Sequence, residues 1–160
     1  HFQASVSGAI YYISSIYALV LLFTSLSLES GIIYFAAKNE IPVAKLFSFS
    51  ILWSLAIGLI SFFVAWYFFK EAYQGISAKL ITVSATLFIA GNLLITYCSG
   101  FFYARNNFRT PNIIIIAGTV LLIALIPYRG RSIIPAINDE NYFYIYFGSF
   151  FIQGIFIIKI

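Results

Sequence analysis

The stretch Gly8–Lys38, GAIYYISSIYALVLLFTSLSLESGIIYFAAK, is apolar over a membrane-spanning length and carries one carboxylate, Glu29, near its end. A helix rises about 1.5 Å per residue and crosses a hydrocarbon core of roughly 30 Å in about 20 residues. The stretch therefore predicts a spanning helix at about 9–37. Helical steps back from Glu29 meet small, polar or aliphatic residues: Ser25, Leu22 or Leu21, Ala18 and Ser14. This stripe indicates a face turned toward other helices or water.

The composition separates this chain from soluble domains. Hydrophobic residues make up 62% of its 160 residues and charged residues 9%, whereas soluble domains are roughly 45 to 50% apolar and 25% charged. The net charge of +4 comes from nine Lys and Arg dispersed between apolar runs. That distribution favours anchoring at membrane edges over binding to nucleic acid. We expect an integral membrane protein in contact with the lipid bilayer.

Gaps without charged residues define four further helices. No Asp, Glu, Lys or Arg occurs in residues 46–69, 80–104, 110–128 and 141–158, and each gap is about as long as a spanning helix. With the first stretch they predict an all-α integral membrane protein, a bundle of about five transmembrane helices in one membrane domain over 1–160. The expected ranges are 9–37, 46–69, 80–104, 113–127 and 142–160.

Small and polar residues within these ranges leave alternatives open. Ser54 and Gly58 are four residues apart, so they either let a neighbouring helix approach closely or are small residues without a packing role. Four polar residues share one helical face: Asn92, Thr96, Ser99 and Tyr103. This face either forms hydrogen bonds between helices or lines a solvated pathway. The single cysteine, Cys98, is interpreted as packing.

The ends of the chain and its connections give further expectations. The chain begins with His1, contains no Met and stops inside an apolar run, so we expect a fragment of a longer protein. Each of the four connections carries two Lys or Arg, which ties the positive-inside count. We expect connections 39–44 and 105–112 on one side of the membrane and 70–79 and 128–141 on the other.

Catalytic motifs are not found in the sequence. There is no Walker loop, no metal-ligand set and no nucleophile beside a base, and His1 is the only histidine. Asp139 and Glu140 are adjacent and therefore point apart, which is typical of a solvated loop. The sequence thus predicts no catalytic residue, no metal and no cofactor, and a protein that is not an enzyme.

Two segments of the first stretch carry a family resemblance. Ser7–Tyr12 gives a Gly-aromatic start, and Leu26–Phe35, LSLESGIIYF, precedes a short basic connection. Together they resemble the second transmembrane segment of Wzx-type polysaccharide flippases, of the multidrug/oligosaccharidyl-lipid/polysaccharide exporter superfamily. Arg105–Arg109 resembles the loop after the fourth segment of that family. The resemblance covers most of the chain in helix order and loop length.

The resemblance implies a part of a larger two-lobed transporter. Such a protein moves lipid-linked oligosaccharide across the inner (cytoplasmic) membrane by alternating access, for cell-surface polysaccharide such as lipopolysaccharide O-antigen. This chain would supply the second to sixth segments of the first lobe of a multi-pass protein, with Lys38–Lys45 and Arg105–Arg109 on the cytoplasmic side. Flippases for anionic sugars are expected to hold basic residues in a central cavity, whereas every Lys and Arg here lies at or near a span end.

Six residues are the transport or cavity candidates: Glu29, Ser25, Asn92, Thr96, Ser99 and Arg105. Glu29 is either a helix-end carboxylate that reaches water or pairs with Lys38 or Lys45, or a group that exchanges a coupling proton or cation, or an ion-pair partner, as the lobes move. Two other functions stay open. One is a drug or metabolite exporter of the same superfamily, and the other is a membrane-embedded polysaccharide polymerase or ligase, for which residues 128–141 form a short loop.

Overall fold

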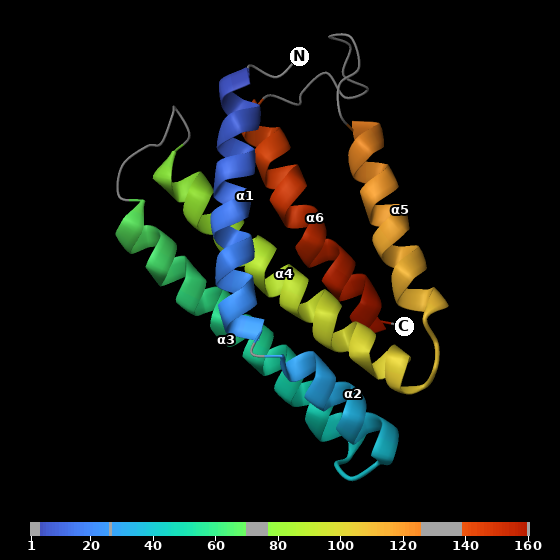
Figure 1. Cartoon of the computed structure of the whole chain (residues 1–160). Coiled ribbons are helices and arrows are strands. Elements are labelled where there is room, and N and C mark those ends of the chain that lie inside the picture. The colour runs from blue at the N-terminus through green and yellow to red at the C-terminus, as the bar shows by residue number, and fades with distance from the viewer. Residues whose placement is uncertain (1–3, 26, 70–76, 126–138, 160) are drawn as a thin grey trace.

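The computed structural model describes residues 4–25, 27–69, 77–125 and 139–159, and every element in these ranges is an α-helix. This confirms the all-α prediction for the described residues. The helices are α1 Ala4–Ser25, α2 Leu28–Lys38, α3 Val43–Phe68, α4 Ala78–Ala104, α5 Arg109–Leu125 and α6 Asp139–Lys159. Figure 1 shows them as one bundle of elongated helices.

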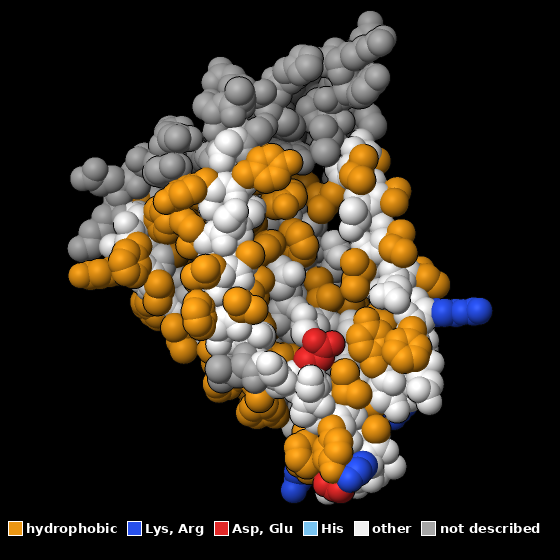
Figure 2. Space-filling model, in the orientation of Figure 1, with side chains coloured by type: hydrophobic (Ala, Val, Ile, Leu, Met, Phe, Trp, Pro, Cys, Tyr) orange, Lys and Arg blue, Asp and Glu red, His pale blue; other side chains and the backbone are white. Residues whose placement is uncertain are grey.

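Two described helices, α3 and α4, are long and apolar enough to cross a membrane. The bent pair of α1 and α2 makes a third candidate if it is one span, whereas the apolar parts of α5 and α6 are shorter. Large apolar side chains are also exposed on outer faces, such as Leu52 (68%) and Phe63 (67%) of α3 and Ile123 (62%) of α5. Figure 2 shows apolar side chains over much of the visible face.

The range 9–37, expected as one helix, is divided into two. Helix α1 ends at Ser25, α2 begins at Leu28, and the two are bent by 44°. Ser27 has a left-handed backbone, with φ of 53°, a conformation that disfavours residues with a Cβ. Because Ser25–Ser27 contains no Gly or Pro, the strongest signals of a turn do not mark this break.

Helix α4 is the centre of the bundle, with fifteen of its 27 residues buried. Figure 1 shows it beside α3 on one side and α6 on the other. At its contact with α6, a Cβ added to Gly91 would fall on the backbone of Phe150 and Phe151, and one added to Gly154 would lie 2.9 Å from Leu94 Cβ. The two helices therefore pack backbone to backbone at these glycines.

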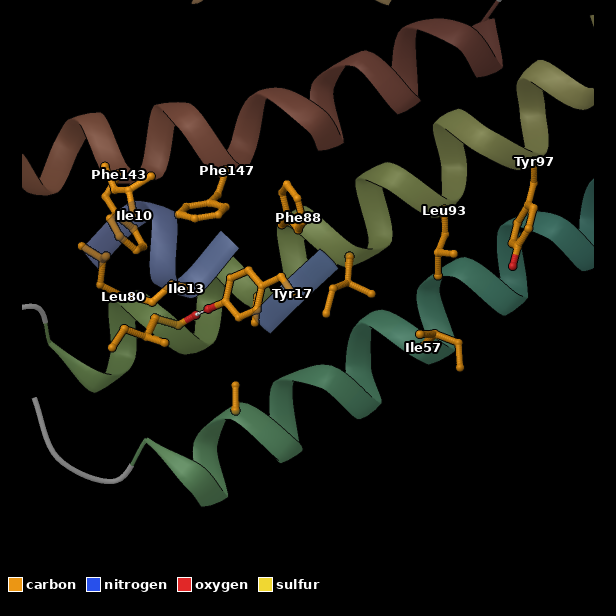
Figure 3. Close-up of a cluster of buried hydrophobic side chains, with 14 of the residues drawn as sticks. Ile10, Ile13, Tyr17, Ile57, Leu80, Phe88, Leu93, Tyr97, Phe143 and Phe147 are labelled. Carbon is orange, nitrogen blue, oxygen red and sulfur yellow. Dashed lines mark hydrogen bonds between the residues drawn. The ribbon is translucent and has the colours of Figure 1, made fainter. Parts of the chain in front are cut away.

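An aromatic core joins α1, α4 and α6. The ring of Phe147 lies 5.5 Å from the rings of both Tyr17 and Phe88, and Phe143 lies 4.7 Å from Phe147. All four side chains are less than 9% exposed. Figure 3 shows these rings between the three helices, with Ile13 beside them. This cluster fixes α1 against the end of the bundle where α4 begins.

Helix α3 packs on α4 through small residues. The hydroxyls of Ser50, Ser54 and Ser61 donate to carbonyls four residues earlier, each at 2.8 Å, so these buried groups need no partner on another helix. A Cβ on Gly58 would lie 2.8 Å from Ala90 Cβ. Of the two alternatives for Ser54 and Gly58, the structure shows close helix approach.

The helices other than α2 begin two to five residues before the ranges expected for them, and α5 and α6 show why. Helix α5 starts at Arg109, four residues before residue 113, and Pro111 falls in its first turn, where no backbone donor is needed. Asn107 caps this turn by accepting from Thr110 N at 3.3 Å. Asp139, expected in a loop with Glu140, begins α6. Connections 70–76 and 126–138, including Arg129 and Arg131, lie outside the described residues.

Candidate functional site

A cavity of about 380 Å³ lies at the break between α1 and α2, and we call it the break cavity. It opens among three helices, because α1 ends here, α2 starts here and α4 passes behind them. Six of its nine lining residues are polar, in a chain that is 62% hydrophobic. The lining residues are Ala18, Leu21, Leu22, Ser25, Ser27, Glu29, Ser30, Asn92 and Thr96.

The α1 side of the cavity is the stripe expected from helical spacing, as far as Ala18. The Ser25 hydroxyl donates to Leu22 O at 3.3 Å, within its own helix. Ser14, the far member of the stripe, does not line the cavity, and its buried Oγ has no hydrogen-bond partner among the described residues. The stripe therefore faces the break cavity in its last two turns and the bundle interior before them.

Glu29 is the acidic group of the cavity and stands in the first turn of α2, half-buried. The first backbone N–H groups of a helix have no partner within it, and its dipole favours negative charge there. The sequence leaves open a pair with Lys38 or Lys45. Among the described residues, however, Lys38 pairs with Glu40 at 3.7 Å and lies over the Tyr34 ring at 4.4 Å. No ion pair of Glu29 is found among the described residues, so this geometry favours a carboxylate that reaches the cavity over one paired with a lysine.

Asn92 and Thr96 bring α4 into the cavity. The Asn92 amide donates to Phe88 O of its own helix at 2.8 Å, and no hydrogen bond to another helix is found for either residue within the described ranges. Of the two interpretations of the polar face, this geometry favours the lining of a solvated space at these two positions.

The other candidates lie elsewhere. Ser99 is 2% exposed, its Oγ has no partner among the described residues, and it does not line the cavity. Arg105 caps the C-terminal end of α4. It lines two other hollows, of about 200 and 180 Å³, the first with Asn39 and the second with Cys98. Four of the six candidates therefore line the break cavity: Ser25, Glu29, Asn92 and Thr96. Ser99 and Arg105 do not line it.

Three residues at the break cavity are not indicated by any pattern in the sequence. Ser27 and Ser30 line the cavity only because the helix breaks beside them. Tyr97 is fully buried, and its hydroxyl donates to Ser25 O at 3.0 Å. A tyrosine in the middle of an apolar run is the available signal, since a buried phenol seeks a hydrogen-bond acceptor.

The break cavity gathers groups that accept a proton or surround a cation. These are one carboxylate, one amide, four hydroxyls and the freed end of a helix. Within the part of the chain that the structure describes, no three His, Cys, Asp or Glu side chains lie together as a metal site would require. The polar groups of the cavity suit hydrogen bonding and the binding of a cation or a proton.

Comparisons of the chain with protein-family models, with curated proteins and with solved structures give no match. The function is inferred from the residues and their geometry.

Proposed function

We propose that the chain is the membrane-embedded part of a transporter, and specifically of a Wzx-type flippase for lipid-linked oligosaccharide. The observation that carries the proposal is the break cavity, a polar hollow at an interrupted helix in an apolar bundle. In lipid, irregular backbone is tolerated only where it is buried in protein or lines a water-filled cavity. Interrupted helices also recur at the substrate and ion sites of secondary transporters.

The distribution of basic residues supports a multi-pass position in the inner membrane with a defined orientation. Figure 1 places the turn after α2, the turn after α4 and the C-terminal end of α6 at the same end of the bundle. Lys159 in the last turn of α6 thus joins the Lys and Arg of those two turns. This additional basic residue supports a cytoplasmic position for this end of the bundle.

A small-molecule exporter is the second candidate, and the size of the cavity favours it. Pockets for drug-sized ligands span roughly 300 to 1,000 Å³, and the break cavity holds about 380 Å³ with a single carboxylate. A small cationic solute fits those features directly. An oligosaccharide requires more space, which a second lobe would supply.

Transport by the full-length protein in proteoliposomes tests the proposal. A fluorescent lipid-linked oligosaccharide is added, and a membrane-impermeant quencher reports its arrival at the outer leaflet. We expect faster arrival than in protein-free vesicles. Movement of a small organic cation alone would favour the exporter, and oligosaccharide of increased length, detected by mass spectrometry, would identify a polymerase. Folded protein that moves neither solute overturns the proposal.

Cysteine accessibility tests the membrane topology separately. In a Cys98→Ser background, single cysteines at Asn39 and Asn107 should react with an impermeant reagent from one side of the membrane. Cysteines at Gln74 and Asn138, two positions outside the described residues, should react from the other side. Reaction of positions 39 and 74 from the same side would contradict the proposed order of spans.

A further inference from the structure

Two buried tyrosines donate their hydroxyls to backbone carbonyls far away in the sequence. Tyr17 of α1 bonds Ile81 O at 2.6 Å, and Tyr97 of α4 bonds Ser25 O at 3.0 Å. Their exposed fractions are 2% and 0%. Figure 3 shows the two rings in separate parts of the core. The residues are therefore matched in chemistry and burial and differ in the carbonyl that they bond.

The two carbonyls differ in the other hydrogen-bond donors that are available to them. Ile81 lies in the first turn of continuous α4, where its carbonyl also accepts from the backbone N–H four residues later. Ser25 is the last residue of α1, and the last four carbonyls of a helix have no donor within it. Among the described residues, the Tyr97 hydroxyl is the donor that Ser25 O finds. Loss of this hydroxyl removes the donor that the described residues provide to this carbonyl.

The same part of α4 also holds α2. Gly100 follows Tyr97 by less than one turn, and a Cβ there would lie 3.3 Å from Ile33 Cγ1 and 3.5 Å from Ile32 Cγ2. Ile32 is 3% exposed. Helix α4 thus contacts both sides of the break, by a hydrogen bond to the end of α1 and by close packing on α2.

We propose that Tyr97 is a positioning residue, whose hydroxyl fixes the bend between α1 and α2 and so holds Ser25 and Glu29 at the break cavity. The bend requires a left-handed backbone at Ser27, and this conformation costs free energy in a residue with a Cβ. The hydrogen bond from Tyr97 to Ser25 O offsets this cost, and it stabilises the bent conformation and not a straight one. The consequence for transport rests on the proposed function, whereas the bend itself does not.

Distance measurements between α1 and α2 test the proposal in the full-length protein in lipid nanodiscs. Spin labels are attached to Leu19→Cys on α1 and Ala37→Cys on α2, both exposed positions, in a Cys98→Ser background. With Tyr97→Phe, we expect a second distance population, because loss of one hydrogen bond shifts a conformational equilibrium by about two- to tenfold. With the matched control, Tyr17→Phe, the distance distribution should equal that of the parent.

Thermal stability, measured on the same samples, separates positioning from general packing. A role in stability alone would lower the midpoint of Tyr97→Phe and leave the distances unchanged, and that result overturns the proposal. An equal change of distances in Tyr17→Phe overturns it as well. So does failure of Tyr97→Phe to fold while Tyr17→Phe folds, since Tyr97 would then serve stability and not the bend.

Discussion

The two faces of α4 are built in opposite ways. Toward α6, Gly91 removes a side chain so that two backbones meet, and Phe88 stacks edge-on with Phe150 at 4.8 Å. Toward the break of α1 and α2, Asn92 borders a hollow of about 380 Å³. Gly91 and Asn92 are adjacent in sequence and point about 100° apart on the helix. Within one turn of α4, one face packs tightly on α6 and the other borders a cavity. Substitutions on the packed face should lower stability, and substitutions on the cavity face should lower transport.

The largest effect is expected from Gly91→Ala on the packed face. Its Cβ would fall on the backbone of Phe150 and Phe151, which cannot rotate away as a side chain would. We expect a loss of roughly 1–3 kcal/mol in unfolding free energy, toward the upper end. The measurement is chemical unfolding in detergent micelles.

Gly31→Ala is the matched control for that substitution. A Cβ at Gly31 meets nothing within 4 Å, and alanine is favoured over glycine in a helix by about 1 kcal/mol. This variant should be as stable as the parent or more so. Equal destabilisation by both substitutions would show that the contact with α6 is not the cause.

Glu29→Gln should act on transport and spare the fold. The amide keeps the size of the side chain and its capacity to accept a hydrogen bond, but it carries no charge. If Glu29 exchanges a proton or cation, transport by the full-length protein should fall by about tenfold or more, equivalent to about 1.4 kcal/mol. The transport rate is followed across pH. An unchanged rate with unchanged pH dependence would leave only the interpretation of a solvated helix-end carboxylate.

Asn92→Leu should change the stability little and reduce transport less than Glu29→Gln does. Its amide bonds its own helix, and polar contacts between helices in membranes average only about 0.6 kcal/mol, so the unfolding midpoint should move little. Transport should fall several-fold, because an apolar side chain then occupies the cavity wall. Loss of folded protein with normal activity per remaining molecule would indicate a packing role instead.

The sequence predicts those features that depend on local spacing. Apolar runs between charges predict helices, and the stripe through Ser25 and Ala18 reaches the cavity because α1 stays helical up to its end. Charges mark helix ends poorly, since Asp139 belongs to the first turn of α6, where the helix dipole favours a carboxylate. The start expected for α6 is late for this reason, whereas α5 begins early at Arg109, with Pro111 in its first turn.

Features that depend on helix pairing could not be predicted. Nothing in the spacing of Glu29 and Asn92 shows that α2 and α4 meet, and Gly91 reveals its role only beside the backbone of α6. The break itself lacks a Gly or Pro signal. It is held by Tyr97, a residue 72 positions along the chain from Ser25.

The left-handed backbone of Ser27 has a consequence for natural sequence variation. A φ of 53° is open to Gly and accessible to Asn or Asp, but it is strongly disfavoured for Val, Ile and Thr. Relatives that keep the break should therefore vary only among Gly, Asn, Asp and Ser at this position. A β-branched residue here should accompany an unbroken helix and, because Ser25 O then bonds its own helix, the loss of the tyrosine at position 97.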